Sequence, residues 1–374
     1  TANVALGYLA LTSNTTASNN VAVGYKALED VTTGTQNVAL GNSTLMQVTT
    51  ANYNTAVGQS ALNATTGGEN NVAVGHETMD ANTTGGSNTA VGKGSLGANT
   101  TASNNTAVGY NSMVANTTGS LNVAVGTLAL DANTTAANNT AIGYTSLGAN
   151  TTGSENTSVG SYSLEANTTA ANNTAVGYGT LNANTTGARN TAIGKSALVA
   201  NTTASSNTAL GGLALQANTT GSVNTAVGDA TLYTNTTGSN NVACGQGALY
   251  ANTTANNNTG IGYSALTANT TGTFNVAVGA FALDDNSDGQ QNTGVGYNAL
   301  SANTTGGSVT AFGSLALDAN TTANYNTAVG ASALSAITTG VESVAVGSSA
   351  LVSATGSSNV ALGHKAGENV TTGT

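Results

Sequence analysis

The chain of 374 residues contains no proline, no tryptophan, one cysteine and three phenylalanines. Charged residues make up 5 % of the sequence, against roughly 25 % in an average soluble domain. So few ionisable groups and large core residues argue against a conventional globular enzyme. Because Cys244 is the single cysteine, no disulfide can form within the chain, and stability must come from other interactions.

Basic charge and long apolar runs are also scarce. The five basic residues are scattered, so the chain carries no electrostatic footprint for nucleic acid. No run of about 18 apolar residues is present, which predicts that nothing in this segment spans a membrane as a helix. Simple disorder is disfavoured too, because the net charge of −10 is spread thinly and Val, Leu and Ala recur at fixed places.

An internal repeat fills the chain from end to end. The segment Asn-Thr/Val-Ala-Val-Gly begins at Asn3 and recurs every 17 residues to Ser343, then once more at Asn359 after a step of 16, which makes 22 copies. Numbering each copy from 1 to 17, position 1 is Asn in 20 copies, position 5 is Gly in all 22 and position 9 is Leu in 19. We therefore predict a single repeat domain over residues 1–374.

The repeated positions predict two short strands and two turns per copy. Positions 2–4 combine β-branched residues with Ala, which favours a strand, and small or apolar residues on both faces predict that both are covered. Leu at position 9 is expected on a second strand and inside, together with the residue at position 4. Asn-Thr-Thr-Gly/Ala at positions 12–15 is typical of a turn.

A 17-residue unit of this kind predicts one coil of an all-β parallel β-solenoid, or β-roll, of 22 coils. Since a single coil cannot bury its own Leu, the coils must stack and place like residues over like residues. The apolar second face of the strand predicts association with further copies of the chain. The expected ladders are exemplified by Gly109, Gly143, Gly177, Leu147, Leu181, Leu198, Asn139, Asn173 and Asn190.

Two stretches carry a family resemblance, Asn-Val-Ala-Val-Gly-Tyr from Asn20 to Tyr25 and Asn-Thr-Ala-Ile-Gly-Tyr from Asn139 to Tyr144. They resemble the head repeats of YadA-like trimeric autotransporter adhesins, and with the Asn-Thr-Thr-Gly interludes they also look like repeats of bacteriophage tail fibres. The resemblance implies a left-handed β-roll, a homotrimer and an extracellular location. The period departs from the family's, which is nearer 14 residues. We expect the segment to belong to a longer fibre protein.

Motifs that could carry chemistry are weak. Gly92-Lys93-Gly94-Ser95-Leu96-Gly97 matches the dinucleotide-binding pattern, but that interpretation needs a helix next and Ala98-Asn99-Thr100-Thr101 follows instead. The two histidines, His76 and His364, are too far apart in the repeat to form a metal site or a catalytic triad. We therefore predict no catalytic residue, no metal site and no cofactor.

Side chains that break the pattern allow three further interpretations. Cys244 takes the place of Val at position 4 and is expected to be a small buried hydrophobe. Tyrosines recur at position 6 and predict either a sugar-binding row or an ordinary surface: Tyr8, Tyr25, Tyr110, Tyr144, Tyr178, Tyr263 and Tyr297. Adjacent threonines at positions 13 and 14 should point apart, which disfavours an ice-binding face.

Asn at position 12 begins an Asn-Thr-Thr sequon in 15 copies. One interpretation is a set of glycan acceptors on a surface turn. The other is a hydrogen-bonded asparagine ladder between coils, as stacked Asn rows form. The sequons begin at Asn14, Asn82, Asn99, Asn116, Asn133, Asn150, Asn167, Asn184, Asn201, Asn218, Asn235, Asn252, Asn269, Asn303 and Asn320.

These observations predict a structural protein, the shaft or head of an extracellular fibre or adhesin on a cell surface or virion. Its partner in this segment would be itself, as a homotrimer or filament, and any host glycan or receptor would be bound outside the segment. The alternative is a carbohydrate-binding solenoid, or less favourably an ice-binding one, that acts through its repeated face.

Overall fold

A computed structural model describes residues 2–372 of the chain, in two compact units, Thr1–Arg189 and Asn190–Thr374. Every strand in both units has three residues, and all of them occupy positions 2–4 of the repeat. The first unit contains β1 (Val4–Leu6), β2 (Val21–Val23), β3 (Val38–Leu40), β4 (Thr55–Val57), β5 (Val72–Val74), β6 (Thr89–Val91), β7 (Thr106–Val108), β8 (Val123–Val125), β9 (Thr140–Ile142), β10 (Thr157–Val159) and β11 (Thr174–Val176).

The second unit is built in the same way. Its strands are β12 (Thr191–Ile193), β13 (Thr208–Leu210), β14 (Thr225–Val227), β15 (Val242–Cys244), β16 (Thr259–Ile261), β17 (Val276–Val278), β18 (Thr293–Val295), β19 (Thr310–Phe312), β20 (Thr327–Val329), β21 (Val344–Val346) and β22 (Val360–Leu362). Each coil is named below by the strand it contains.

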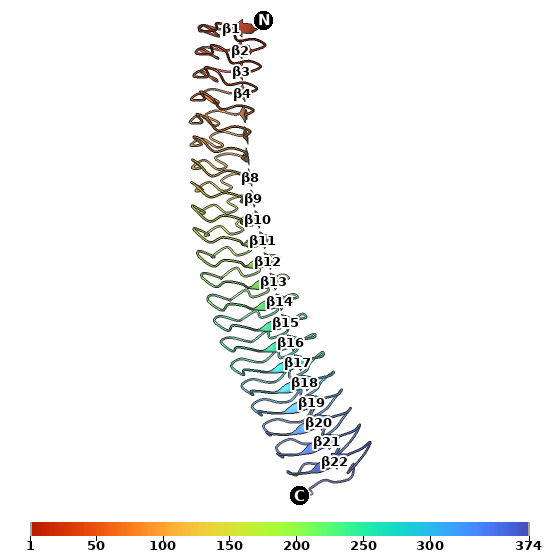
Figure 1. The fold of residues 1–374 in the computed structure, drawn as a ribbon. Helices are drawn as coiled ribbons and strands as arrows, with labels where there is room; N and C mark the ends of the chain where they lie inside the picture. Colours follow the sequence, from red (N-terminus) through yellow and green to blue (C-terminus); the bar gives the residue numbers. More distant parts are fainter. Residues whose placement is uncertain (1, 373–374) are drawn as a thin grey trace. The chain divides into compact units, whose positions relative to one another are not determined.

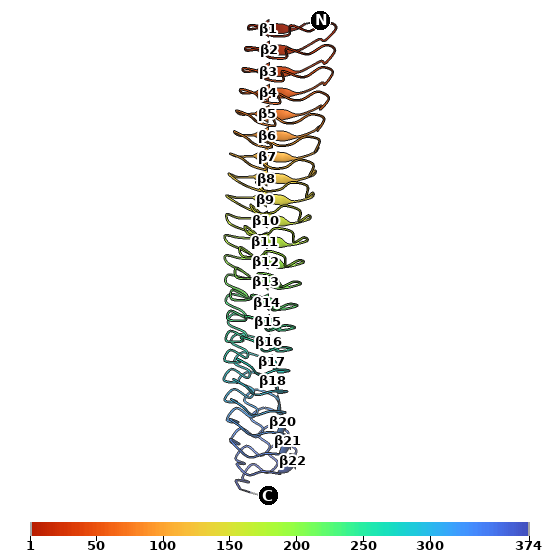
Figure 2. The same ribbon diagram turned by 90° about the vertical axis from the view of Figure 1, so that its left-hand side faces the viewer.

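Within each unit, consecutive strands pair in parallel and stack the coils in chain order (Figures 1 and 2). The register joins each residue to the one 17 positions later, as for Val123 and Thr140. Between β21 and β22 the step falls to 16, and Val344 still pairs with Val360. The all-β parallel solenoid with coils of about 17 residues is therefore confirmed. The prediction of one domain over the whole chain stays a prediction.

Only one face of the strand is buried within a chain. Ala at position 3 points inward and is completely buried in most coils, as Ala124 is. The side chains at positions 2 and 4 lie on the outer face, where Val123 and Val125 are each 36 % exposed. The expectation that position 4 fills the interior is wrong, because alternate strand residues point to opposite faces and the small Ala takes the inner place.

The predicted second strand is also wrong. Residues 5–11 of each coil form a continuous turn, and Leu at position 9 lies in it with a left-handed backbone, as shown by the φ of 52° at Leu181. Position 7 is left-handed as well, with a φ of 62° at Gly179. These two residues curl the chain sharply and still place the Leu side chain inside, where Leu164 and Leu198 are fully buried.

Glycine at position 5 is required by both conformation and space. Gly143 has a φ of 131°, which side chains of L-residues rarely tolerate. A Cβ atom at this place would lie 2.6 Å from the carbonyl carbon of Gly160 in the next coil. The glycine row therefore allows the backbones of neighbouring coils to approach closely at the corner that follows each strand.

Within residues 2–372, the chain has no helix with the length and hydrophobicity that crossing a membrane requires.

Candidate binding surfaces

The first asparagine row, at position 1, joins each coil to the next. The Asn139 amide nitrogen donates to the carbonyl oxygen of Gly153 at 3.0 Å, and its side-chain oxygen accepts from the backbone N–H of Asn156 at 3.0 Å. Asn139 is 1 % exposed. One buried side chain therefore satisfies a carbonyl in its own coil and an N–H in the following coil, which is why Asn suits this place.

The second row, at position 12, is a ladder of side-chain amides. Asn133 Nδ2 donates to Asn116 Oδ1 at 2.8 Å and to the carbonyl of Ala136 at 3.1 Å. Asn133 Oδ1 accepts from Asn150 Nδ2 at 3.2 Å. These amides are 0 % exposed. An amide carries both donors and acceptors, so it can continue such a chain from coil to coil indefinitely.

The predicted sequons coincide with this buried ladder. Of the 15 sequon asparagines, all except the half-buried Asn14 are fully buried. A glycan on the folded coil would have to draw its amide out of the interior and break contacts on both sides. The geometry therefore favours the ladder interpretation. Glycosylation of these asparagines stays a prediction.

The two threonines after each ladder Asn diverge, as predicted. Thr134 Oγ1 donates to the carbonyl of Thr151 in the next coil at 3.2 Å, and its side chain is half-buried. The following Thr135 is exposed. Only one threonine row is therefore turned outward at this turn.

The tyrosines at position 6 are exposed, and six of the seven, all except Tyr110, meet other rings along the stacking direction. Tyr8 and Tyr25 are stacked with centroids 5.7 Å apart. Two groups continue through a ring at position 7: Tyr162 lies edge-on to Tyr144 at 5.3 Å and to Tyr178 at 5.7 Å. The second group joins Tyr263, Phe281 and Tyr297 in the same manner.

The structure decides two further expectations, one about Cys244 and one about the glycine-rich motif that begins at Gly92. Cys244 is exposed, so the prediction of a buried thiol is wrong, for the same reason that applies to every residue at position 4. Gly92 and Gly94 lie in the turn that follows β6, and no helix succeeds them. That turn lacks the helix N-terminus on which dinucleotide binding depends.

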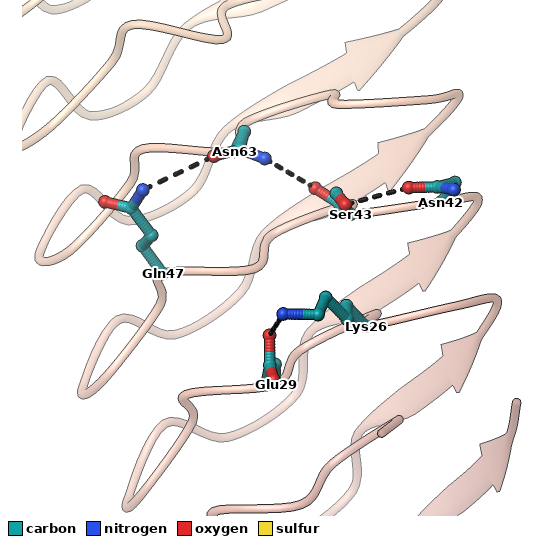
Figure 3. A network of polar contacts seen from close by, with 6 residues as sticks. All are labelled: Lys26, Glu29, Asn42, Ser43, Gln47 and Asn63. Atoms are coloured by element: carbon teal, nitrogen blue, oxygen red, sulfur yellow. Dashed lines mark hydrogen bonds and ion pairs between the residues drawn. The ribbon is translucent and has the colours of Figure 1, made fainter. Parts of the chain in front are cut away.

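Position 10 lies on the outer side of the turn, and its side chain bridges coils when it can donate. Asn63 Nδ2 donates to the carbonyl of Ser43, at position 7 of the preceding coil, at 3.0 Å (Figure 3). Asn182 bonds the carbonyl of Tyr162 at 3.0 Å in the same way. Neutral donors at this position therefore fill the space between neighbouring coils.

Carboxylates at position 10 behave differently, because an ionised carboxylate cannot donate. Asp284 Oδ1 and Asp318 Oδ1 are both buried without a hydrogen-bond partner. Burial, aided by the charge of the adjacent Asp285, raises the pKa of Asp284 to about 6. Burial also raises the pKa values of Asp80 and Asp131.

Two shallow hollows open where position 10 is acidic and the same position of the next coil is small. The first has a volume of about 310 Å³ and is lined by Phe281, Asp284, Asp285, Tyr297, Asn298, Ser301 and Ala302. The second has a volume of about 360 Å³ and is lined by Asp131, Ala132, Thr145, Gly148, Ala149 and Glu165. Neither hollow was predicted from the residue pattern, although the spacing of 17 between Asp284 and Ser301 is visible in the sequence.

Across the described residues 2–372, no three His, Cys, Asp or Glu side chains gather in an arrangement that could hold a metal ion. No known protein-family model matches the chain, and no curated protein is significantly similar to it. The function must therefore be argued from the geometry.

Proposed function

We propose that this chain is a structural segment of an extracellular fibre or adhesin, in which stacked coils act as a spacer for binding regions elsewhere. The observation that carries the proposal is that the repeated side chains form contacts between neighbouring coils of the same chain. The rows at positions 1, 9 and 12 are buried, as Asn139, Leu147 and Asn150 illustrate, and the glycines at position 5 lie close against the backbone of the next coil, as Gly143 does. The outward positions 7, 10, 16 and 17, by contrast, differ from coil to coil and build no repeated reactive centre in the described part of the chain.

The spacer proposal predicts that coils are interchangeable. Deleting Asn122–Asn138 removes one whole coil and should leave the ladders in register. Deleting the eight residues 127–134 should break every row at that point and melt the neighbouring coils. Circular dichroism and hydrogen exchange distinguish the two outcomes. Equal loss of structure in both variants would contradict the modular stacking on which a spacer depends.

We further propose that the fibre is a homotrimer with left-handed coils, as the resemblance to adhesin heads implies. The support is the outer face of the strands, where apolar side chains form a half-exposed stripe in each unit. It includes Val72, Val91, Val123, Val125 and Ile142 in the first unit and Ile193, Val242, Ile261, Val276 and Phe312 in the second, each at least 36 % exposed. Contiguous apolar surface of this kind marks an association face.

Light scattering at micromolar concentration tests the trimer. The expected mass is about three times the chain mass of 36.1 kDa. Replacing Val125 and Ile142 by Thr should weaken association without disturbing the interior, since both side chains lie on the outer face. A folded monomer of the unaltered chain would refute the trimer.

The exposed tyrosine rows support a second candidate, carbohydrate binding along the repeated face. Aromatic rings of this type provide flat surfaces for the apolar face of a sugar, and binding would gain strength through several coils acting together. A glycan array with the isolated chain tests it. Tight binding that is lost on changing Tyr110, Tyr144 and Tyr178 to Ala would favour this candidate over a passive spacer.

A further inference from the structure

The two hollows described above lie at equivalent places in their coils. Both are lined by residues at positions 7, 10 and 11 of neighbouring coils. In each, a small residue at position 10 follows an acidic one: Ser301 after Asp284, and Gly148 after Asp131. A second acid returns one coil later, as Asp318 and Glu165 respectively. In both units the hollow therefore lies where a small residue at position 10 leaves space next to the acidic residue of the preceding coil.

The hollow in the second unit also has aromatic walls. Phe281 and Tyr297 both line it, with ring centroids 6.3 Å apart and planes inclined by 82°. Two nearly perpendicular rings form a corner, which presents a π-surface beside the carboxylates. We name the group of Phe281, Asp284, Asp285, Tyr297, Asn298 and Ser301 the acidic–aromatic hollow.

The negative charge of this hollow has no nearby compensation. No lysine or arginine occurs between Lys195 and Lys365. At about 4.8 Å per coil, Lys365 lies four coils or roughly 19 Å beyond the coil of Tyr297, well past the screening length of about 8 Å. The buried Asp284 Oδ1 has no donor either, because Ser301 Oγ donates instead to the carbonyl of Asp318 at 3.5 Å.

We propose that the acidic–aromatic hollow binds a primary ammonium group carried on an apolar stem, such as a lysine side chain or another alkylamine. The ammonium supplies N–H donors and positive charge to Asp284 and Asp285, while the stem lies against the rings of Phe281 and Tyr297. Carboxylates without a nearby cation and an aromatic corner are two features that this one chemistry satisfies. The inference goes beyond the spacer role, since it assigns a local site to side chains that the repeat does not use.

A divalent cation fits the same hollow less well. Calcium takes six to eight oxygen ligands at 2.3–2.6 Å. Asp284 and Asp318 stand two coils apart, or roughly 9.6 Å along the stack, which is too far for both to ligate one ion. The aromatic walls supply no oxygen ligands beyond one phenol.

Fluorine NMR with fluorophenylalanine gives a direct test, because the chain has only Phe274, Phe281 and Phe312. Titration with butylammonium at pH 7.5 should move the Phe281 resonance saturably at millimolar concentration and leave the other two in place. Tetramethylammonium, which lacks N–H donors, should bind more weakly. Butanol, which has the same stem without charge, should leave Phe281 unmoved.

Charge-neutral variants complete the experiment. Asp284→Asn with Asp285→Asn keeps the side-chain shapes and should weaken butylammonium binding at least tenfold. Asp229→Asn, at an exposed site in another coil, is the matched control and should bind as the unaltered chain does. Circular dichroism verifies that both variants keep the fold, and Tyr297→Leu provides a second reporter of the aromatic wall with the carboxylates intact.

Three outcomes would overturn the proposal. Equal movement of all three fluorine resonances would show unspecific association with the acidic chain. Unchanged affinity in the Asp284→Asn, Asp285→Asn variant would remove the carboxylates from the site. Saturable displacement of Phe281 by calcium at lower concentration than by butylammonium would assign the hollow to a metal ion instead.

Discussion

The position 12 ladder makes a quantitative prediction about cooperativity between identical side chains. Replacing Asn133 by Val leaves Asn116 Oδ1 without its donor and removes one acceptor from Asn150 Nδ2. Asn150 keeps its bond to the carbonyl of Gly153, and Ala136 keeps the bond from Asn122. The damage is therefore one orphaned acceptor and two lost hydrogen bonds, at Asn150 Nδ2 and at the Ala136 carbonyl, each of which keeps its other partner.

The magnitude follows from those three losses. A buried unsatisfied group costs about 1–3 kcal/mol and each lost hydrogen bond about 0.5–1.5 kcal/mol, so the local free energy of unfolding should fall by about 2–6 kcal/mol. Valine fits the space, because Val31 and Val48 occupy position 12 in two other coils and are fully buried.

The informative comparison is a triple variant in which Asn116, Asn133 and Asn150 all become Val. Where two neighbouring amides are both replaced, donor and acceptor disappear together and neither is orphaned, so the ladder is interrupted only at its two ends. Asn99 Oδ1 loses its donor, and Asn167 Nδ2 loses one acceptor but keeps the carbonyl of Ala170. The amide bonds to the carbonyls of Gly119, Ala136 and Gly153 are lost too, but each carbonyl keeps its donor at position 1. With only one orphaned acceptor, the triple variant should therefore cost about one and a half times as much as the single one, not three times as much.

Hydrogen exchange of peptides that cover residues 99–167 measures the local free energy of unfolding in both variants. A local measurement is suitable because the unfolding of a repeat array is not all-or-none. At tenfold per 1.4 kcal/mol, the single variant should exchange roughly 30- to 20,000-fold faster than the unaltered chain, and the triple variant faster again by a smaller factor. Thr135→Val, at the exposed neighbouring row, serves as the control and should change little. If the triple variant loses three times the free energy of the single one, the ladder is a set of independent contacts and the reasoning fails.

Three further predictions concern other rows. Gly143→Ala should destabilise its coil by more than about 3 kcal/mol through positive-φ strain and collision with Gly160, whereas Gly67→Ala, which meets nothing within 4 Å, should be near neutral in the same exchange assay. Leu164→Ala should cost about 2–5 kcal/mol by cavity formation, seen as local loss of protection. Because the pKa of Asp284 is raised to about 6 from 3.8, ionisation opposes folding, so the stability of this coil should decline from pH 4 to pH 6 in thermal melts. Asp285 is adjacent to Asp284 and Tyr297 lines the same hollow, and Asp284→Asn should flatten that decline.

Much of the architecture was predictable because the repeat is strict. A glycine in every copy at position 5 and an Asn-Thr/Val-Ala start determine where each strand begins and ends, and the spacing of 17 requires the stacking register. The Asn-Thr-Thr turns likewise predicted an asparagine ladder as one of two interpretations. Stacking makes each local preference repeat many times, so weak signals add up.

The interior was less predictable, because the whole coil decides which strand residues point inward and which residues adopt a positive φ. Val125 and Cys244 look like core residues, yet closure of the coil gives the inner place to the small Ala at position 3 and turns position 4 outward. Leu181 adopts a left-handed backbone that its residue type disfavours by about 1–2 kcal/mol, and burial of its side chain offsets that cost. A strand could not have supplied the same bend.

By itself, then, the sequence determined the repeat length, the parallel stacking and the rows that hold it, because these follow from periodic residue types. Only the tertiary structure decided which face of each coil is inside, and which outward side chains from different coils come together. Phe281, Asp284 and Ser301 are ordinary surface residues in their own copies, and they form a hollow only because stacking places coils β17 and β18 side by side. Adjacency between coils is a property of the stack, and no single copy contains it.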